Sequence, residues 1–291
     1  DYILAHVFQD VADGFYIDVG ANDPNIFNVT RFFYERGWHG INIEPNAELY
    51  LQLRSFRQRD INYNVGISTT EGRMIFYQQA YQSDALMPLS TFDKEIVDIQ
   101  KKNGILFKEI VVPVTTLNNL LGKISVREIT FITIDVEGFE KQVLESIDLA
   151  RYKPVVLCIE ASRPGTGDLS YMLWEQIVLN NNYVFAMSDG VNRYYLHKSH
   201  IELLPRFIDI DRCVKLSKYK RGAFETIAMP VRGAFTLNMD FDTKYLLAPL
   251  DIAAQLLHYD SAVNALEVQL NNPKDMDRIA NDLRSELGSG F

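Results

Sequence analysis

The alternation of short apolar strands with helical segments constrains this fold more than any other feature of the sequence. Five buried strands are predicted, each rich in branched or aromatic residues, at 15–20, 40–44, 61–68, 129–135 and 155–160. Four helices are predicted between and after them, at 24–36, 46–56, 140–147 and 170–181. Strands that alternate with helices pair in parallel, and fully apolar strands lie buried on both faces. The pattern predicts a three-layer α/β sandwich with a mostly parallel sheet.

Several segments lie outside this alternation. Residues 183–187 and 193–197 are predicted strands joined by a hairpin-type loop, 188–192, which adds antiparallel pairing at the sheet edge. Residues 81–106 lack clear periodicity apart from one helix near 93–102. They are flanked by two further predicted strands, 73–79 and 109–114.

The pattern changes after residue 205. We expect an α/β domain over 1–205, an irregular connecting region over 206–249 and a helical extension over 250–291. Apolar residues recur at intervals of four and three between Ile252 and Leu270, which is a heptad pattern. Two interpretations of 250–270 stay open: a helix packed on its own domain, and a helix that pairs with a partner or a second copy. The basic stretch Lys215–Arg221 is either a solvated loop or a contact for an anionic surface.

Composition excludes several function classes. The chain has 291 residues, with 29 Lys and Arg against 38 Asp and Glu, so its formal charge is −9. That balance argues against a nucleic-acid binder. Cys158 lies in an apolar run and is expected to be a buried thiol, typical of a reducing compartment. No apolar stretch reaches the roughly 18 residues of a membrane span, and no signal peptide is visible. We therefore expect a cytoplasmic protein.

Acidic residues lie at or just after the ends of four of the predicted strands. They are found in Asp18–Asp23, at Glu44, in Asp135–Gly138 and at Glu160. Because parallel strands end at one edge of the sheet, where such folds bind ligands, we expect these side chains to converge. The plainer interpretation of each acid alone is a helix cap or a solvated strand end.

The loop after the first strand predicts the kind of ligand. Gly20 permits close approach of a ligand to the backbone, but the second and third glycines of a dinucleotide fingerprint are absent. Pyrophosphate binding is therefore disfavoured, and a ligand with a sulfonium and an amino group suits the acids better. Glu44, 26 residues after Asp18, is placed to accept both ribose hydroxyls.

The acids near the ends of the fourth and fifth predicted strands are candidates for a catalytic role towards an acceptor molecule. Asp135, Glu137 and Glu160 can deprotonate a hydroxyl, and Asp135 and Glu160 can also hold a divalent metal. The sequence leaves the choice of base and the use of a metal open. No histidine has metal-ligand spacing to another His or Cys.

Five blocks, in order, resemble the FkbM-type S-adenosylmethionine-dependent methyltransferases. They are 14–24, 31–38, 40–46, 112–117 and 134–140, within a resemblance that covers roughly residues 1–200. The resemblance implies a class I methyltransferase (Rossmann-like) fold, a seven-stranded sheet whose last strand is antiparallel. It also implies methylation of a hydroxyl, often on a sugar of a bacterial glycan or on a secondary metabolite, and thus a hydroxyl-bearing small molecule or glycan as acceptor. A place at the inner membrane face, within a glycan-assembly system, is compatible with this activity.

The expected site has two groups of residues. The catalytic candidates are Asp135, Glu137 and Glu160. The expected cofactor-binding residues are Asp18, Gly20, Ala21, Asn22, Asp23, Glu44, Pro45 and Gly66. Two alternatives stay open: an NAD-dependent sugar oxidoreductase or epimerase, and a non-catalytic methyltransferase-like scaffold that binds a partner through its C-terminal helices.

Overall fold

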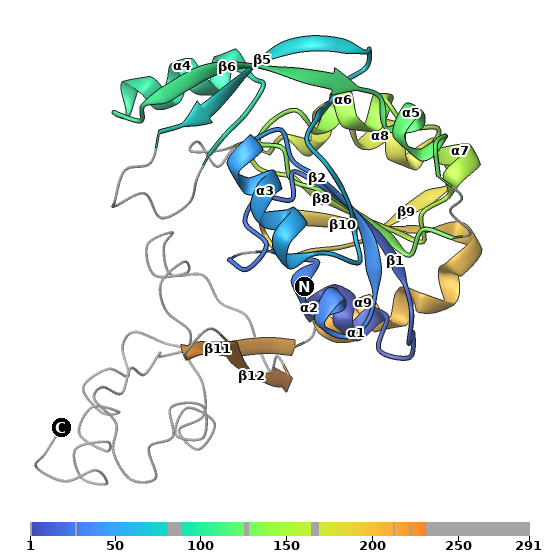
Figure 1. Cartoon of the computed structure of the whole chain (residues 1–291). Coiled ribbons are helices and arrows are strands. Elements are labelled where there is room, and N and C mark those ends of the chain that lie inside the picture. Colours follow the sequence, from blue (N-terminus) through green and yellow to red (C-terminus); the bar gives the residue numbers. More distant parts are fainter. Residues whose placement is uncertain are drawn as a thin grey trace, which may run out of the picture. The chain divides into compact units, whose positions relative to one another are not determined.

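Figure 1 shows a computed structural model of the chain. The structure describes residues 2–26, 28–80, 89–124, 128–163, 169–211, 213–220 and 223–230. Two compact units divide between Asp211 and Arg212.

A seven-stranded sheet lies at the centre of the first unit, with the strand order β3-β2-β1-β7-β8-β10-β9. The strands are β1 (Phe15–Val19), β2 (His39–Ile43), β3 (Ile61–Tyr63), β7 (Phe131–Ile134), β8 (Val156–Glu160), β9 (Tyr183–Ser188) and β10 (Asn192–His197). The first five strands in this order pair in parallel. β10 runs antiparallel to both of its neighbours. The predicted mostly parallel sheet with an antiparallel last strand is confirmed.

The helices cover both faces of this sheet (Figure 1). On one face are α5 (Leu117–Leu121), α6 (Glu140–Glu145), α7 (Leu149–Tyr152) and α8 (Glu175–Leu179), which share a buried core with β1, β7 and β8. On the other are α1 (Tyr2–Val7), α2 (Arg31–Glu35) and α9 (Leu204–Asp211), built around Phe33, Trp38 and Phe131. α3 (Ala47–Phe56) begins at Asn46, whose side chain accepts hydrogen bonds from two backbone amides, as predicted for an N-cap.

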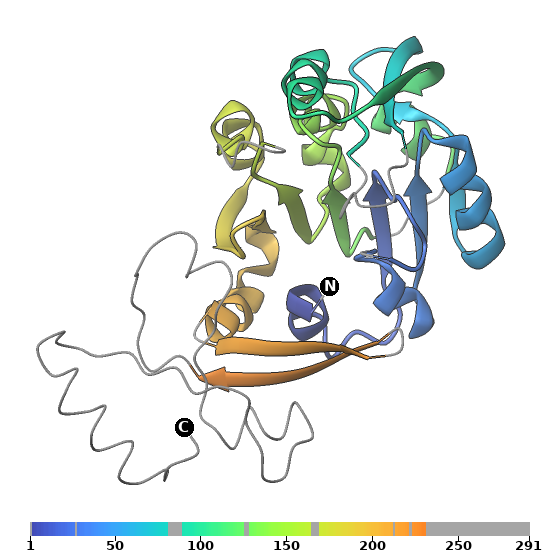
Figure 2. The same ribbon diagram turned by 90° about the vertical axis from the view of Figure 1, so that its left-hand side faces the viewer.

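A second, three-stranded sheet has the order β4-β6-β5. Its strands are β4 (Gly66–Ile67), β5 (Gly72–Gln79) and β6 (Phe107–Thr115), with α4 (Lys94–Lys102) inserted between the last two. Figure 2 shows this cyan-to-green sheet beyond the arrowheads of the blue strands β1 and β2. The prediction of a single strand over 61–68 is therefore wrong, because its two halves, β3 and β4, pair in different sheets.

Two predicted helices are shorter in the structure. The segment 24–36 is helical only from Arg31, because the Asp23 carboxylate accepts hydrogen bonds from the amides of Asn25 and Ile26 and forms a turn. The segment 170–181 splits into a 3₁₀ turn, η1 (Tyr171–Leu173), and α8. A further 3₁₀ segment, η2 (Lys198–Leu203), precedes α9.

The second unit begins with a hairpin. β11 (Cys213–Lys220) and β12 (Ala223–Pro230) pair antiparallel within 206–249, where an irregular region is expected from the sequence. The heptad segment 250–270 and the predicted extension over 250–291 lie outside the described residues. In the described parts of the chain, no helix has the length and apolarity needed to cross a membrane.

Candidate active site at the carboxyl edge of the sheet

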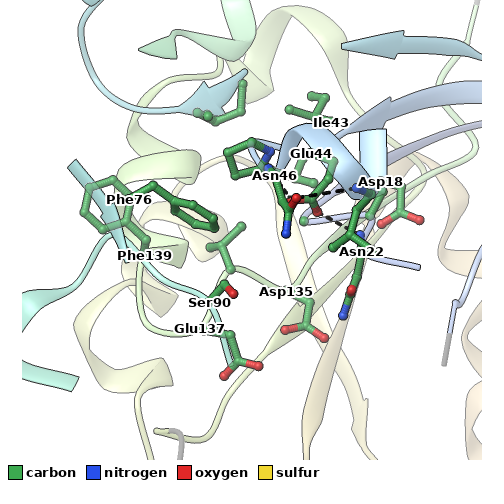
Figure 3. Close-up of a pocket in the computed structure, with 18 of the residues that line it drawn as sticks. Asp18, Asn22, Ile43, Glu44, Asn46, Phe76, Ser90, Asp135, Glu137 and Phe139 are labelled. Carbon is green, nitrogen blue, oxygen red and sulfur yellow. Dashed lines mark hydrogen bonds between the residues drawn. The ribbon is translucent and has the colours of Figure 1, made fainter. Parts of the chain in front are cut away.

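A cavity of about 150 Å³ opens where β1, β2 and β7 end. The strand order reverses between β1 and β7, so the loops after these two strands diverge and leave a crevice. Figure 3 shows Asp18, Asn22 and Glu44 on one side of the cavity and Phe76 and Phe139 on the other. Asp135 and Glu137 lie between these two sides (Figure 3).

Most of the expected cofactor-binding residues line this cavity. They are Asp18, Gly20, Ala21, Asn22, Glu44, Pro45 and Gly66. Asp23 is the exception, since its carboxylate is used to hold the turn before α2. Among the catalytic candidates, Asp135 and Glu137 line the cavity, whereas Glu160 lies beside Asp135 and outside the lining.

Gly20 brings the loops after β1 and β7 into direct contact. Its φ is +86°, in the left-handed region, and an added Cβ would lie 1.9 Å from the backbone oxygen of Asp135. Only a residue without a side chain fits here. The backbone amides of Gly20 and Ala21 both donate to the carbonyl oxygen of Ile43, which fixes the loop to the end of β2.

Glu44 joins two loops through its carboxylate. Oε2 accepts a hydrogen bond of 2.9 Å from the Asn22 amide, and Oε1 accepts one of 2.7 Å from the Asn46 amide. A carboxylate has about four acceptor positions, so each oxygen keeps one for a ligand. Burial raises the pKa of Glu44 to about 7, against the effect of both amides. Glu44 thus shapes the cavity and keeps acceptor capacity towards it.

Asp18 lies beneath the same loop. Its Oδ2 atom is 2.8 Å from Oγ1 of Thr30, which is fully buried. Burial raises the pKa of Asp18 to about 7, while the Thr30 hydroxyl and the charge of Arg57 act in the opposite direction. Asp18 is therefore close to the balance between its charged and neutral forms at physiological pH.

Asp135 and Glu160 form a pair of carboxyl groups within hydrogen-bonding distance. Asp135 is exposed on the cavity wall, and Glu160 is buried with no hydrogen-bond partner for its Oε2. Burial, followed by the nearby charge of Asp135, raises the pKa of Glu160. The surrounding protein also raises the pKa of Asp135, but the hydrogen bond with Glu160 opposes this effect. The two carboxyl groups therefore titrate as a coupled pair, and the neutral form is favoured more strongly on Glu160, where burial and the charge of Asp135 act in the same direction.

Glu137 has an unusual backbone. Its φ is +55°, which is uncommon for a residue with a side chain, and the Thr91 hydroxyl donates a 2.7 Å hydrogen bond to its carbonyl oxygen. This contact ties the small sheet to the loop after β7. Burial raises the pKa of Glu137 to about 9, helped by the charges of Asp135 and Glu140. Strained residues held in this way are common in active sites.

The small sheet contributes cavity residues that the sequence analysis missed. They are Phe76, Gln78 and Gln79 on β5, and Ser90 and Phe92 after it. Phe92 contacts both Phe76 and Phe139, with ring centroids 4.8 and 5.4 Å apart. Segment 81–106 has no periodicity from which the position of Phe92 could be predicted. In the structure, the Phe92 ring packs against Gly66 and so forms part of this side of the cavity.

The buried acids predict an unusual pH dependence of stability. Burial raises the pKa of Asp18, Glu44 and Glu140 to about 7, whereas such groups titrate near about 4 when unfolded. The folded protein then binds more protons than the unfolded chain between these values, so stability should fall as pH rises from about 4 to 7. Glu137 extends a smaller decline to about pH 9. Thermal unfolding of the ligand-free protein between pH 5 and 9 measures this slope. Glu140→Gln should flatten it, and a melting temperature that climbs across the range would contradict the assignment.

The described residues do not support a metal site at the carboxyl edge of the sheet. Within the described parts of the chain, no group of three or more His, Cys, Asp or Glu side chains is arranged to hold a metal ion. We therefore assign no metal to Asp135 and Glu160.

The strand order and the acidic cavity at the switch point define a Rossmann-like domain of the methyltransferase type. The family model for the methyltransferase FkbM domain matches residues 18–185, which are 168 of the 291 residues. The chain therefore belongs to the FkbM methyltransferase family, as the resemblance of its sequence blocks predicts. A comparison with curated proteins returned no match.

Proposed function

We propose that this methyltransferase uses S-adenosylmethionine to methylate a hydroxyl group on a sugar of a bacterial polysaccharide, glycolipid or glycosylated metabolite. The observation that carries the proposal is the acidic cavity at the switch point, lined by Asp18, Glu44, Asp135 and Glu137. These acids favour a cation over a pyrophosphate, because a bound cation stabilises their charged forms, whereas a pyrophosphate would be repelled by them.

The residues around β1 and β2 suit the cofactor. S-adenosylmethionine supplies an electrophilic methyl group on a positively charged sulfur, which leaves as a neutral thioether. The free acceptor positions of Glu44 suit the two ribose hydroxyls. Leu49, Val65 and Ile67 give an apolar wall next to Glu44 for a flat base. Asn22 keeps a buried side-chain oxygen without a hydrogen-bond partner, which suits a donor on the ligand.

The residues from the small sheet suit the acceptor. Phe76, Phe92 and Phe139 offer aromatic surface, and Gln78 and Ser90 offer polar groups beside it. A sugar has apolar ring faces and a rim of hydroxyls, so it matches a surface of this mixed kind.

Glu137 is the proposed general base. It lies between the two sides of the cavity, and the described residues make no hydrogen bond to its carboxylate (Figure 3). As the acceptor oxygen forms its bond to the methyl carbon, the carbon–sulfur bond breaks and the hydroxyl proton passes to Glu137. The charge of Asp135 keeps the region attractive to the sulfonium, and the fixed backbone at Gly20 and Glu137 holds the reactants in line.

Calorimetric titration tests the cofactor assignment. We expect the wild type to bind S-adenosylmethionine and not NAD. Glu44→Gln should weaken binding about 10- to 100-fold, since it removes acceptors for charge-assisted hydrogen bonds. Glu48→Gln is the matched control, because Glu48 is an exposed acid in the first turn of α3. A folded wild type that binds NAD but not S-adenosylmethionine would instead favour the oxidoreductase alternative.

The cytoplasmic location and the pairing of segment 250–270 with a partner or a second copy stay predictions from the sequence.

A further inference from the structure

Arg57 is a buried cation that the function proposed above does not use. It follows α3, and only 2% of its surface is exposed. Its guanidinium donates to the carbonyl oxygen of Pro24, at 3.2 Å, and to Oδ1 of Asn28, and its carbon Cζ lies 4.9 Å from the Tyr34 ring centroid. Its Nη1 atom is buried and has no hydrogen-bond partner among the residues that the structure describes. An arginine is seldom fully buried unless its charge is paired or hydrogen-bonded.

The two oxygens bound by Arg57 belong to the loop between β1 and α2. Asn28 also donates from Nδ2 to the carbonyl oxygen of Ala21, at 2.8 Å, and both residues line the cavity. The guanidinium therefore reaches the cavity wall through one intervening side chain. Its position holds this loop against the body of the domain.

The hydrogen bonds also connect Arg57 to Asp18. Thr30 Oγ1 lies 2.8 Å from Asp18 Oδ2 and 2.9 Å from Asn28 Oδ1, but a hydroxyl has one proton to donate. Arg57 satisfies one acceptor position of Asn28 Oδ1, and a carboxylate is a stronger acceptor than an amide oxygen, so the Thr30 proton favours Asp18. A donated hydrogen bond favours the charged carboxylate.

The remaining charges near Asp18 act against its ionisation. Asp135 and Asp60 raise the pKa of Asp18, and the charge of Asp18 in turn raises the pKa of Glu44. The Tyr16 hydroxyl donates a hydrogen bond to Asp60. Arg57 is the cation among the largest influences on Asp18, and it lowers the pKa of Asp18.

We propose that Arg57 is a positioning residue of the ligand site, whose guanidinium holds the loop between β1 and α2 and balances the charge of Asp18 for a cationic ligand. The ligand part of this proposal rests on the proposed function, because S-adenosylmethionine carries the sulfonium and the ammonium that Asp18 would face. The part that concerns Asp18 and the loop is a property of the ligand-free protein.

The test compares Arg57→Met, Arg57→Lys and a matched control. Arg59→Met is the control, because Arg59 is exposed two residues later and stacks on the same Tyr34 ring. Carboxyl-carbon NMR of the ligand-free protein follows the titration of Asp18. Arg57→Met should raise the midpoint by about one pH unit or more, while Arg57→Lys, which keeps the charge, should stay near the wild type.

Affinity for S-adenosylmethionine between pH 6 and 9 gives the second readout. Arg57→Met should bind at least about tenfold more weakly at pH 7, and the loss should shrink towards pH 9, where Asp18 is charged in both proteins. A merely structural role would give a loss that does not change with pH. An unchanged Asp18 midpoint in folded Arg57→Met would overturn the proposal.

Two further outcomes are separable. If the wild type binds no S-adenosylmethionine, the proposed function fails, and the NMR titration still decides the role of Arg57. If Arg57→Met does not fold, Arg57→Lys decides through hydrogen exchange. Both hydrogen bonds come from Nη2, which lies one bond beyond the point that a lysine Nζ reaches. The amides of the loop should therefore exchange faster in Arg57→Lys than in the wild type. Unchanged exchange in Arg57→Lys would overturn the proposal.

Discussion

Glu137→Gln is expected to lower methyl-transfer turnover by about 10²- to 10⁴-fold, the usual contribution of a general base. Glutamine has nearly the same size, so the cavity and the hydrogen bond from Thr91 to the backbone carbonyl should remain. Affinity for S-adenosylmethionine should therefore change little, which separates a catalytic defect from a binding defect. Formation of S-adenosylhomocysteine with a panel of methyl glycosides measures the turnover.

The pH profile gives this prediction a second readout. Burial raises the pKa of Glu137 to about 9. A base works in its charged form, so wild-type turnover should rise with pH up to about 9 and then level off. In Glu137→Gln this rise should vanish.

Glu145→Gln is the matched control for Glu137→Gln. Glu145 is an exposed acid of α6, paired with Lys141 at 3.7 Å, and its loss should leave turnover unchanged. A fully active Glu137→Gln variant would move the assignment of the base to Asp135 or Glu160.

Gly20→Ala is expected to have the largest effect on stability. The φ of +86° costs an alanine about 1–2 kcal/mol. The added Cβ also meets the Asp135 backbone oxygen at 1.9 Å, and overpacking of this kind costs a further 1–3 kcal/mol, roughly. We expect a total loss of about 3 kcal/mol in denaturant unfolding, with loss of S-adenosylmethionine binding because the loops after β1 and β7 move apart.

Gly37→Ala provides the matched comparison. Gly37 has a similar φ of +97°, but nothing lies within 4 Å of its added Cβ. It should show only the backbone cost, about 1–2 kcal/mol, and retain ligand binding. Equal losses in the two variants would show that the close approach of Gly20 to Asp135 is not what the site requires.

The two glycines illustrate what a local pattern can predict. The neighbours of Gly37 alone predict that a helix ends there, and in the structure Gly37 lies just after the end of α2. The sequence likewise predicts a turn at Gly20, at the end of a strand. Its contact with Asp135 joins residues 115 positions apart and depends on the pairing of β1 with β7. Sequence reasoning expected both residues in the site and could not state the distance between them.

The acceptor side of the cavity, formed by the small sheet, could be predicted from the sequence only in part. The sequence pattern predicts β5 and β6 as strands, but their separation from the main sheet follows from the pairing of β6 with both β4 and β5. That pairing places Phe76, Ser90 and Phe92 on the cavity, although segment 81–106 has no periodicity of its own. Contacts of this kind are set by long-range packing, which a single sequence does not encode in any local window.

The sequence by itself determined the alternation of strands and helices, and with it the edge of the sheet where Asp18, Glu44, Asp135 and Glu137 meet. This follows because side-chain periodicity is local and parallel strands share one carboxyl edge. Only the tertiary structure decided the direction in which the pKa of each acid shifts, since this depends on burial and on neighbours distant in sequence. It also decided that Asp23 holds a turn and that Arg57 is buried beneath the loop, where residue type alone would place an arginine on the surface.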